Sequence, residues 1–160
     1  MDMRKKEYFK KIASDPTPLS FNLRRRASFN EVDVLGIVWY GRYAIYFEEA
    51  QRELCRRCDL TYQDYFSANL LAPIVAFHVD YQQPLYLDEE FIIKATLVWS
   101  EGAKINIEYE IIKEDGSIAT RGYTIQVLLD AKTKQACIVT PELIECFRKR
   151  WRNNEFKCLK

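Results

Sequence analysis

A single acid precedes a predicted helix in the stretch EVDVLGIVWYGRYAIYFEEA, residues 31–50. Asp33 belongs to a short turn that contains Gly36, and we expect the helix to begin near Tyr40 and Gly41. The first backbone N–H groups of a helix have no partner within it and carry the positive end of its dipole. They can therefore polarise a carbonyl oxygen while a nearby carboxylate attacks the carbonyl carbon. Asp33 beside a helix opening suits acyl transfer.

Other roles are open for the acidic residues of this stretch. Asp33 could simply cap its turn, because aspartate often accepts a hydrogen bond from the backbone two residues on. Glu48 and Glu49, on the predicted helix, could supply the reactive carboxylate instead. Glu48 precedes Arg52 by four residues, a spacing typical of a surface ion pair, so we rank both glutamates second.

The remaining candidate residues favour structural roles. Cys55 and Cys58 form a C-x-x-C, which could be a redox pair or half of a zinc site, but the chain has no second such motif and one histidine, so we favour packing residues. That histidine, His78, lies on a predicted strand without a serine, cysteine or metal ligand beside it. We expect it to be hydrogen-bonded inside or beside the sheet.

Composition indicates one ordinary globular domain. The chain has 160 residues, with 24 basic and 23 acidic side chains, so no strong field for a nucleic acid is present. No apolar run is long enough to cross a membrane, and the first residues lack the apolar core of a secretion signal. The five cysteines have no regular spacing, which favours reduced thiols. We expect a cytoplasmic protein that binds neither nucleic acid nor membranes.

The elements around Asp33 follow from hydrophobic periodicity. Residues 21–31 alternate with period two, which predicts a strand. A helix with one apolar stripe follows, formed by Tyr43, Phe47, Ala50, Leu54 and Cys58. Residues 59–71 indicate a second short helix or a lid. Its aromatic residues could line an acyl pocket, but ordinary core packing is the commoner role for such a cluster; they are Tyr62, Tyr65 and Phe66.

Period-two patterns dominate the rest of the chain. Residues 74–82, 90–99, 104–112 and 119–130 predict four successive strands in an antiparallel meander, with a weak fifth at 135–139. Thr140 should cap a final helix that runs to about Trp151. Residues 1–20 form a basic N-terminal extension with a short helix within residues 3–12. The expected class is α+β, with about five or six antiparallel strands wrapped around one long central helix.

The pattern Asp-x-x-Gly-Ile-Val-Trp-Tyr-x-x-Tyr, followed by Glu-Glu-Ala-x-Arg, resembles the active-site signature of the 4-hydroxybenzoyl-CoA thioesterase family. The resemblance covers residues 21–151, and it implies a hot-dog domain there, an N-terminal extension at 1–20 and a C-terminal tail at 152–160. It further implies that an acyl-CoA is hydrolysed to a carboxylic acid and CoA. Asp33 would be the nucleophile or the general base, the backbone amide of Tyr40 would polarise the thioester, and Gly41 would allow close approach of the substrate.

The resemblance also implies a homodimer, often paired into a dimer of dimers, and requires no cofactor other than the CoA of the substrate. Many relatives carry histidine at position 40 and tyrosine at position 29, where this chain has Tyr40 and Phe29. The hydroxybenzoyl-CoA type itself has an aromatic residue at position 40 and uses its backbone amide, so that subgroup still fits.

Substrate contacts are less completely matched. Trp39 and Tyr43 add aromatic surface near Asp33, which suits an aromatic or medium-chain acyl group. The basic cluster that follows Trp99 in the family is reduced here to Lys104. An acyl carrier protein therefore stays open as the carrier, and so does a module that binds acyl-CoA or acyl carrier protein without turnover.

Overall fold

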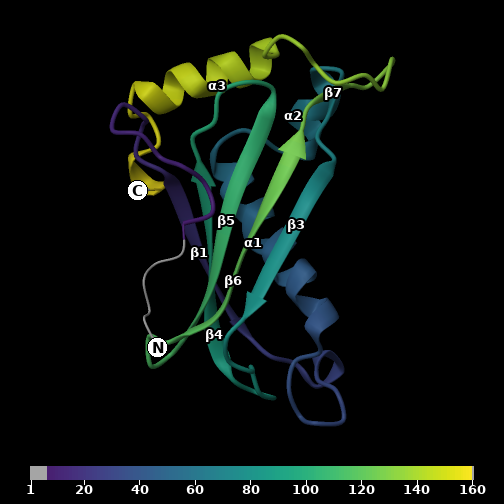
Figure 1. The fold of residues 1–160 in the computed structure, drawn as a ribbon, viewed down its shortest axis with the longest axis vertical. Helices are drawn as coiled ribbons and strands as arrows, with labels where there is room; N and C mark the ends of the chain where they lie inside the picture. Colours follow the sequence, from purple (N-terminus) through teal and green to yellow (C-terminus); the bar gives the residue numbers. More distant parts are fainter. Residues whose placement is uncertain (1–6, 160) are drawn as a thin grey trace.

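The long helix α1 (Tyr43–Arg57) lies against one face of a five-stranded antiparallel sheet (Figure 1). The computed structural model describes residues 7–159. Every member of the predicted apolar stripe of α1 is at most 3% exposed. Phe47 stacks on Tyr109 of the sheet with their ring centroids 4.3 Å apart. The stripe therefore builds the core between helix and sheet, as its spacing predicted.

The sheet contains β1 (Leu19–Arg26), β3 (Ile74–Tyr81), β4 (Glu90–Val98), β5 (Lys104–Lys113) and β6 (Ile118–Val127). Two short strands, β2 (Leu70–Leu71) and β7 (Leu129–Asp130), pair separately. The helices α2 (Tyr62–Ser67) and α3 (Glu142–Arg152) complete the fold, with single 3-10 turns at Phe29–Glu31, Tyr40–Arg42 and Lys157–Leu159. The predicted α+β architecture, five main strands around one long helix, is confirmed.

The predicted meander of four successive strands is wrong at its first member. The strand order is β1-β4-β5-β6-β3, so β3 pairs with β6 and not with β4. The link between β3 and β4 passes the helix opening, where the Val38 N–H donates to the Leu85 carbonyl and the Asp88 N–H to the Ala27 carbonyl. These bonds guide β4 to β1 and leave β3 at an edge of the sheet (Figure 1).

Several predicted boundaries also differ. Strand β1 begins at Leu19 and ends at Arg26, because Ser28 and Glu31 form a capping box that turns residues 29–31 into a 3-10 turn. Residues 135–139 form no strand; a single bridge joins Ala136 to Leu129. The last helix is capped at Pro141, one residue after Thr140.

The N-terminal segment crosses the face of the sheet opposite α1. The Tyr8 hydroxyl donates to Asp80 Oδ2 at 2.6 Å, and Lys11 Nζ pairs with Glu108 at 3.3 Å. His78 lies on β3, with Nε2 3.1 Å from Asp80 Oδ1 and its ring stacked on Tyr123, but Nε2 does not form the expected hydrogen bond within the described residues. Residues 7–12 are not helical, and residues 3–6 of the predicted helix lie outside the described residues.

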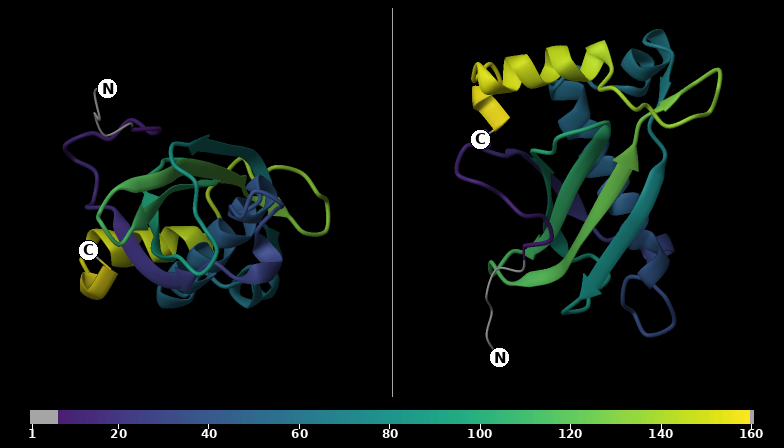
Figure 2. Two further views of the ribbon diagram at one scale, coloured as in Figure 1. Left: turned by 90° about the horizontal axis from the view of Figure 1, so that it is seen from below. Right: turned by 45° about the horizontal axis from the view of Figure 1, so that its top comes forward.

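The core extends beyond both ends of the predicted domain. Leu19 is fully buried, and Phe156 and Leu159 pack into the same cluster with at most 4% exposure. Two further views show the sheet curling over the helices (Figure 2). Among residues 7–159, no helix combines the length and the apolar character needed to span a bilayer.

Candidate active site

The turn that carries Asp33 is held by its own backbone and side chain. The Asp33 N–H donates to the Ile37 carbonyl at 2.9 Å, and the Gly36 N–H donates to the Asp33 carbonyl at 3.0 Å. Gly36 adopts φ +72°, which glycine tolerates best. Asp33 Oδ1 accepts the Leu35 N–H at 2.8 Å, so the turn-capping role is real. Oδ2 has no hydrogen-bond donor among the described residues, which leaves it available for chemistry.

Asp33 opens onto a pocket of about 320 Å³ beside the start of the long helix. Three aromatic residues contribute to its wall, Tyr40 and Tyr43 from the helix opening and Tyr81 from the end of β3, and apart from Asp33 the other lining residues are aliphatic or uncharged polar. Burial raises the pKa of Tyr43 to about 12, so its phenol stays neutral near pH 7. The pocket therefore offers one carboxylate in mostly uncharged surroundings.

The helix begins where the sequence predicted. A 3-10 turn over Tyr40–Arg42 leads directly into α1. The Tyr40 N–H finds no acceptor within residues 7–159, as expected for the first amide of a helix. Because Asp33 and Tyr40 line the same pocket, the structure brings together the two groups that the sequence singled out.

Gly41 makes room for the neighbouring tryptophan. A Cβ atom built on Gly41 would lie 2.1 Å from Cζ3 of Trp39, so the indole covers this glycine. Trp39 remains 47% exposed, and its ring lies 5.0 Å from that of Tyr40. The expected open approach over Gly41 is thus filled by a side chain. Trp39 lies at the helix opening but does not line the Asp33 pocket.

Lys104 lies far from Asp33 within one chain. It pairs with Val127 at the end of β6 that lies beneath α3, whereas the Asp33 turn lies at the opposite end of the sheet (Figure 1). Two arginines of α3 accompany it. The Arg148 and Arg152 guanidinium carbons lie 5.6 Å and 4.6 Å from the Trp99 ring centroid.

These cations were missed because α3 is distant in sequence. Their signal was the four-residue spacing of Arg148 and Arg152, which places both on one helix face. Arg148 also donates to the Gly102 carbonyl at 2.6 Å. Tertiary packing therefore places Arg148 and Arg152 at the turn after Trp99, where the local sequence contains the single cation Lys104.

A buried ion-pair network supports the Asp33 turn. Glu31 is 5% exposed and accepts from Arg25 at 2.6 Å, from the Ser28 N–H at 2.8 Å and from the Tyr46 hydroxyl at 3.0 Å. Arg25 Nε also lies 2.8 Å from Glu49. Sequence reasoning missed Glu31, although the spacing Ser28-x-x-Glu31 was the signal of a capping box.

The alternative carboxylates are occupied by ion pairs. Glu48 pairs with Arg52 at 3.9 Å, at the predicted spacing, and Glu49 pairs with Arg25. The pKa of Glu49 is raised, mainly because the carboxylate is partly buried, and the Arg25 charge opposes that rise. Neither glutamate lines the pocket that Asp33 shares with Tyr40.

The cysteine pair has the character of packing residues. Burial raises the pKa of Cys55 and of Cys58 to about 12, so both are neutral thiols at pH 7. No group of three or more potential metal ligands occurs among residues 7–159.

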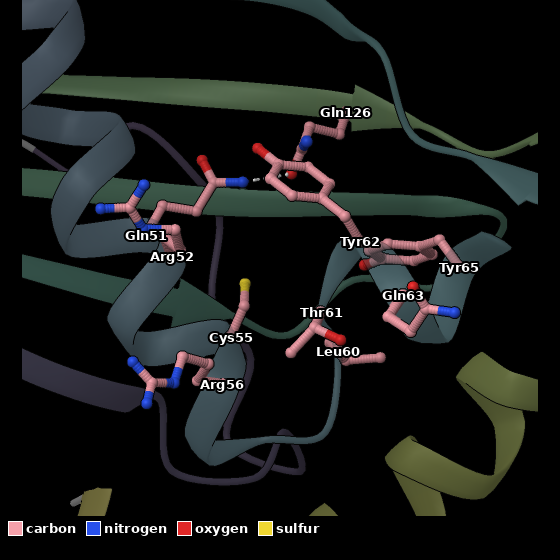
Figure 3. Close-up of a pocket in the computed structure, with 10 residues that line it drawn as sticks. All are labelled: Gln51, Arg52, Cys55, Arg56, Leu60, Thr61, Tyr62, Gln63, Tyr65 and Gln126. Carbon is pink, nitrogen blue, oxygen red and sulfur yellow. Dashed lines mark hydrogen bonds between the residues drawn. The ribbon is translucent and has the colours of Figure 1, made fainter. Parts of the chain in front are cut away.

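A second pocket lies between α1 and α2 (Figure 3). Of the aromatic residues that we expected in the core, Tyr65 is buried, but Tyr62 and Phe66 are 58% and 70% exposed, so that expectation is wrong for two of the three. The helix α2 is too short to bury a full face, and Tyr62 lines this second pocket instead.

Comparisons with known proteins agree on one kind of protein. The model of the thioesterase-like superfamily matches residues 27–147. A protein of Aquifex aeolicus that is named as an esterase is 31% identical over 101 residues, which cover 63% of this chain and 79% of its own. A 1,4-dihydroxy-2-naphthoyl-CoA hydrolase of Nostoc punctiforme is 23% identical over 138 residues, covering 86% of this chain and 93% of its own.

A solved structure has the same fold. The DHNA-CoA thioesterase of Staphylococcus aureus superposes with a TM-score of 0.70 and 21% identity, and the match covers 87% of this chain and 90% of that one. At this identity the likeness is one of fold.

Proposed function

Because this chain belongs to the thioesterase-like superfamily, we propose that it hydrolyses an acyl-CoA to a carboxylic acid and free CoA at the Asp33 pocket. One observation carries the assignment. Asp33, with a free carboxylate oxygen, and Tyr40, with a free backbone N–H, line one pocket at the opening of the long helix. The superfamily makes the chain a thioester hydrolase, and the choice of the 4-hydroxybenzoyl-CoA family within it belongs to this proposal.

The mechanism uses the two free groups in turn. Asp33 Oδ2 attacks the thioester carbonyl carbon, forming a mixed anhydride as the C–S bond breaks and CoA leaves as its thiolate, which then takes a proton. Water cleaves the anhydride and restores the carboxylate. In the alternative route, Asp33 takes a proton from water as that water attacks the same carbon, and the CoA thiolate takes the proton from Asp33 when the C–S bond breaks. In both routes the Tyr40 N–H stabilises the negative charge on the carbonyl oxygen, and no metal or prosthetic group takes part.

The aromatic residues at the helix opening and the cations of α3 indicate which acyl group and which carrier the substrate contains. Tyr43 lines the Asp33 pocket and Trp39 stands beside Tyr40 at the helix opening, and this aromatic surface supports an aromatic or medium-chain acyl group. The name of the Nostoc relative, which specifies a naphthoyl thioester, supports the aromatic option. We assign the CoA phosphates to Lys104, Arg148 and Arg152, because converging cations bind phosphate well. Since these cations lie far from Asp33 in one chain, they would serve a site completed by another subunit.

The free edge of β3 supports a homodimer, alone or paired into a dimer of dimers. Within residues 7–159 this strand pairs only with β6, and its exposed apolar side chains include Ile74, Val75 and Phe77. An unpaired apolar edge is a ready surface for a second copy of the same strand. Val75→Lys should therefore reduce the mass in light scattering to that of a monomer. If the mass of Val75→Lys is unchanged, β3 does not form the dimer interface. The five unpaired cysteines favour a cytoplasmic location.

The decisive experiment compares two aspartates with the same turn geometry. Asp115 Oδ1 accepts the Ser117 N–H at 2.8 Å, as Asp33 Oδ1 accepts the Leu35 N–H. Thiol release from aromatic, short, medium and long acyl-CoAs should fall at least about a thousandfold in Asp33→Asn and stay near wild type in Asp115→Asn. Equal losses of thiol release in both variants would mean that Asp33 serves only to cap its turn.

The other outcomes separate the rival functions. If thiol is released only from an acylated carrier protein, then that protein, and not CoA, carries the acyl group of the substrate. Binding of acyl-CoA without release of thiol from any substrate would make the chain a binding module.

A further inference from the structure

A polar cavity of about 240 Å³ lies between the N-terminal segment and the outer face of the sheet, which is the face away from α1 (Figure 2). Tyr8 and Lys11 close it from the N-terminal side. None of its residues lines the Asp33 pocket or the pocket between α1 and α2, so neither of those sites accounts for it. Its volume, roughly eight waters at ~30 Å³ each, admits a small metabolite or ion. Six polar side chains from β1, β4, β5 and β6 form its floor: Ser20, Lys94, Thr96, Glu108, Glu110 and Arg121.

Strand pairing places three charged residues of this floor in one row. Lys94 of β4 lies opposite Glu110 of β5, and Glu110 lies opposite Arg121 of β6. Arg121 Nε donates to Glu110 Oε1 at 3.2 Å, and the side chains of this pair are 13% and 21% exposed. Neighbouring strands lie about 4.8 Å apart, so Lys94 and Arg121 flank one carboxylate from two sides. That carboxylate is committed to Arg121.

Lys94 carries a positive charge without a counter-ion in the described chain. The residue is half-buried, yet its ammonium group forms no ion pair or hydrogen bond within residues 7–159. Arg121 uses one of its five N–H groups on Glu110, which leaves four on its terminal nitrogens without an acceptor in the same range. Charged groups held away from water without partners are costly, so both cations favour a ligand that brings acceptor oxygens.

The acidic side chains around the cavity are largely committed to partners. Glu108 accepts the Tyr8 N–H at 3.2 Å through Oε1 and Lys11 Nζ at 3.3 Å through Oε2. Asp80 accepts the Tyr8 hydroxyl and does not line the cavity. Glu110 Oε2 is the one lining carboxylate oxygen that has no donor within the described residues. Uncommitted donors therefore outnumber uncommitted acceptors, and the three cations and two acids of the lining give a net charge of +1.

Two hydroxyl groups add to the donors of the floor. Ser20 Oγ and Thr96 Oγ1 lie 3.0 Å apart where β1 pairs with β4. Thr96 is two residues from Lys94, so the two side chains leave the sheet on the same face. Because one hydroxyl donates to the other, the hydrogen of the second is left for a ligand.

We propose that this cavity binds a small oxyanion, a carboxylate or a phosphate group. Lys94, the terminal nitrogens of Arg121 and the hydroxyl pair of Ser20 and Thr96 hold it. Such an anion brings the acceptor oxygens that these donors lack, and it neutralises the Lys94 charge. The planar end of the Arg121 guanidinium matches two oxygens of either group. This site is separate from the hydrolysis at Asp33 and does not depend on it.

NMR titration of the ¹⁵N-labelled protein tests the site, because it separates this cavity from the cations of α3. Inorganic phosphate and succinate are the anions, and succinamide is the neutral counterpart of succinate, all added at constant ionic strength. At least one anion should shift the amide signals of Lys11, Lys94 and Thr96 saturably, with a Kd below about 10 mM. Succinamide should not. The anion that saturates identifies the group as a phosphate or a carboxylate. Signals of Arg148 and Arg152 report separately on α3.

A pair of matched variants checks the role of Lys94. Lys94→Met removes the charge and keeps most of the side-chain length, so it should weaken binding at least about fivefold. Arg24→Met is the control. Arg24 lies on the same outer face, on β1, with a side chain 72% exposed and outside the cavity, so its loss should leave the Kd unchanged.

Glu110→Gln should act in the opposite direction. The amide oxygen still accepts a hydrogen bond from Arg121, and the negative charge beside the bound anion is lost, so binding should tighten at least about threefold. Damage to the fold cannot produce such a gain. This variant therefore decides the matter if Lys94→Met does not fold.

Several outcomes would overturn this inference. They are the absence of saturable shifts at the cavity with both anions, an equal response to succinamide, an unchanged Kd in both Lys94→Met and Glu110→Gln, and shifts confined to Arg148 and Arg152. Thiol release that depends on Asp33 is measured independently. The anion site and the thioesterase can therefore fail separately.

Discussion

The phenolic hydroxyl of Tyr81 donates a hydrogen bond to the backbone carbonyl oxygen of Tyr40, at 3.0 Å. It ties the end of β3 to the helix opening, and the Tyr81 ring also meets Tyr43 edge-on at 4.9 Å. The edge strand that we assign to the dimer interface therefore also positions the peptides beside the Tyr40 N–H, which we propose as the catalytic amide.

Removing that bond should impair catalysis without unfolding the protein. Tyr81→Phe keeps the ring and loses one hydrogen bond worth ~1 kcal/mol, so kcat should fall by up to about tenfold. Steady-state thiol release measures the change. Tyr86→Phe is the control, since its hydroxyl makes no hydrogen bond within residues 7–159. A Tyr81→Phe enzyme with unchanged kcat would show that this anchor does not position the amide.

Glu31 should be essential for stability. It is buried and holds Arg25, Tyr46 and the Ser28 N–H, so Glu31→Ala leaves buried partners unpaired and should cost about 3–5 kcal/mol. Urea unfolding measures the loss. Glu90→Ala, which removes an exposed pair with Arg26, should cost less than about 1 kcal/mol. Similar costs for the two variants would contradict the buried network.

Gly41→Ala should displace the Trp39 indole and leave the core intact. Trp39 is the exposed tryptophan, since Trp99 and Trp151 are 6% and 3% exposed, so a red shift of the emission would report its release. The shift should vanish when the change is made in a Trp39→Phe background. Unchanged emission in Gly41→Ala would mean that the indole does not rest on this glycine.

Two defective chains should complement each other if each site combines Asp33 of one subunit with the α1–α2 pocket of the other. We expect Asp33→Asn and the pocket-filling Cys55→Trp to be inactive as homodimers. Their heterodimer would contain one intact site and regain about half of the wild-type activity. Co-expression with two affinity tags isolates the heterodimer for thiol-release assays. If the heterodimer regains no activity, Asp33 and the pocket that it works with belong to the same chain.

Stability should decline at high pH because buried groups resist ionisation. Burial raises the pKa of Cys58 and of Tyr43 to about 12, whereas the unfolded groups ionise near 9 and 10. Above pH 9 the unfolded chain therefore loses protons that the folded chain keeps. Each such group lowers the free energy of unfolding by up to ~1.4 kcal/mol per pH unit.

Urea midpoints from pH 8 to pH 11 test this decline. Cys58→Ala should flatten the slope even though it lowers stability overall, whereas Cys158→Ala, at an exposed thiol, should leave the slope unchanged. Equal slopes in wild type and Cys58→Ala would contradict a buried, neutral thiol.

The sequence by itself determined the local features of this protein. The apolar stripe of α1, the Asp33 turn with Gly36 and the helix opening at Tyr40 were all predictable. Each depends on residues within a few positions of one another, where periodicity, capping and turn preferences act directly. The five main strands were visible for the same reason, although their ends shifted by several residues in places.

Only the tertiary structure decided which distant parts meet. The place of β3 beside β6 depends on hydrogen bonds between segments that no local pattern specifies. Packing of α3 brought Arg148 and Arg152 to Trp99, and the Trp39 indole took the space over Gly41. The amide pair of Gln51 and Gln126 joins residues 75 positions apart in the chain. Such contacts form because folding buries apolar surface and pairs polar groups over the whole chain, so sequence spacing alone could not reveal them.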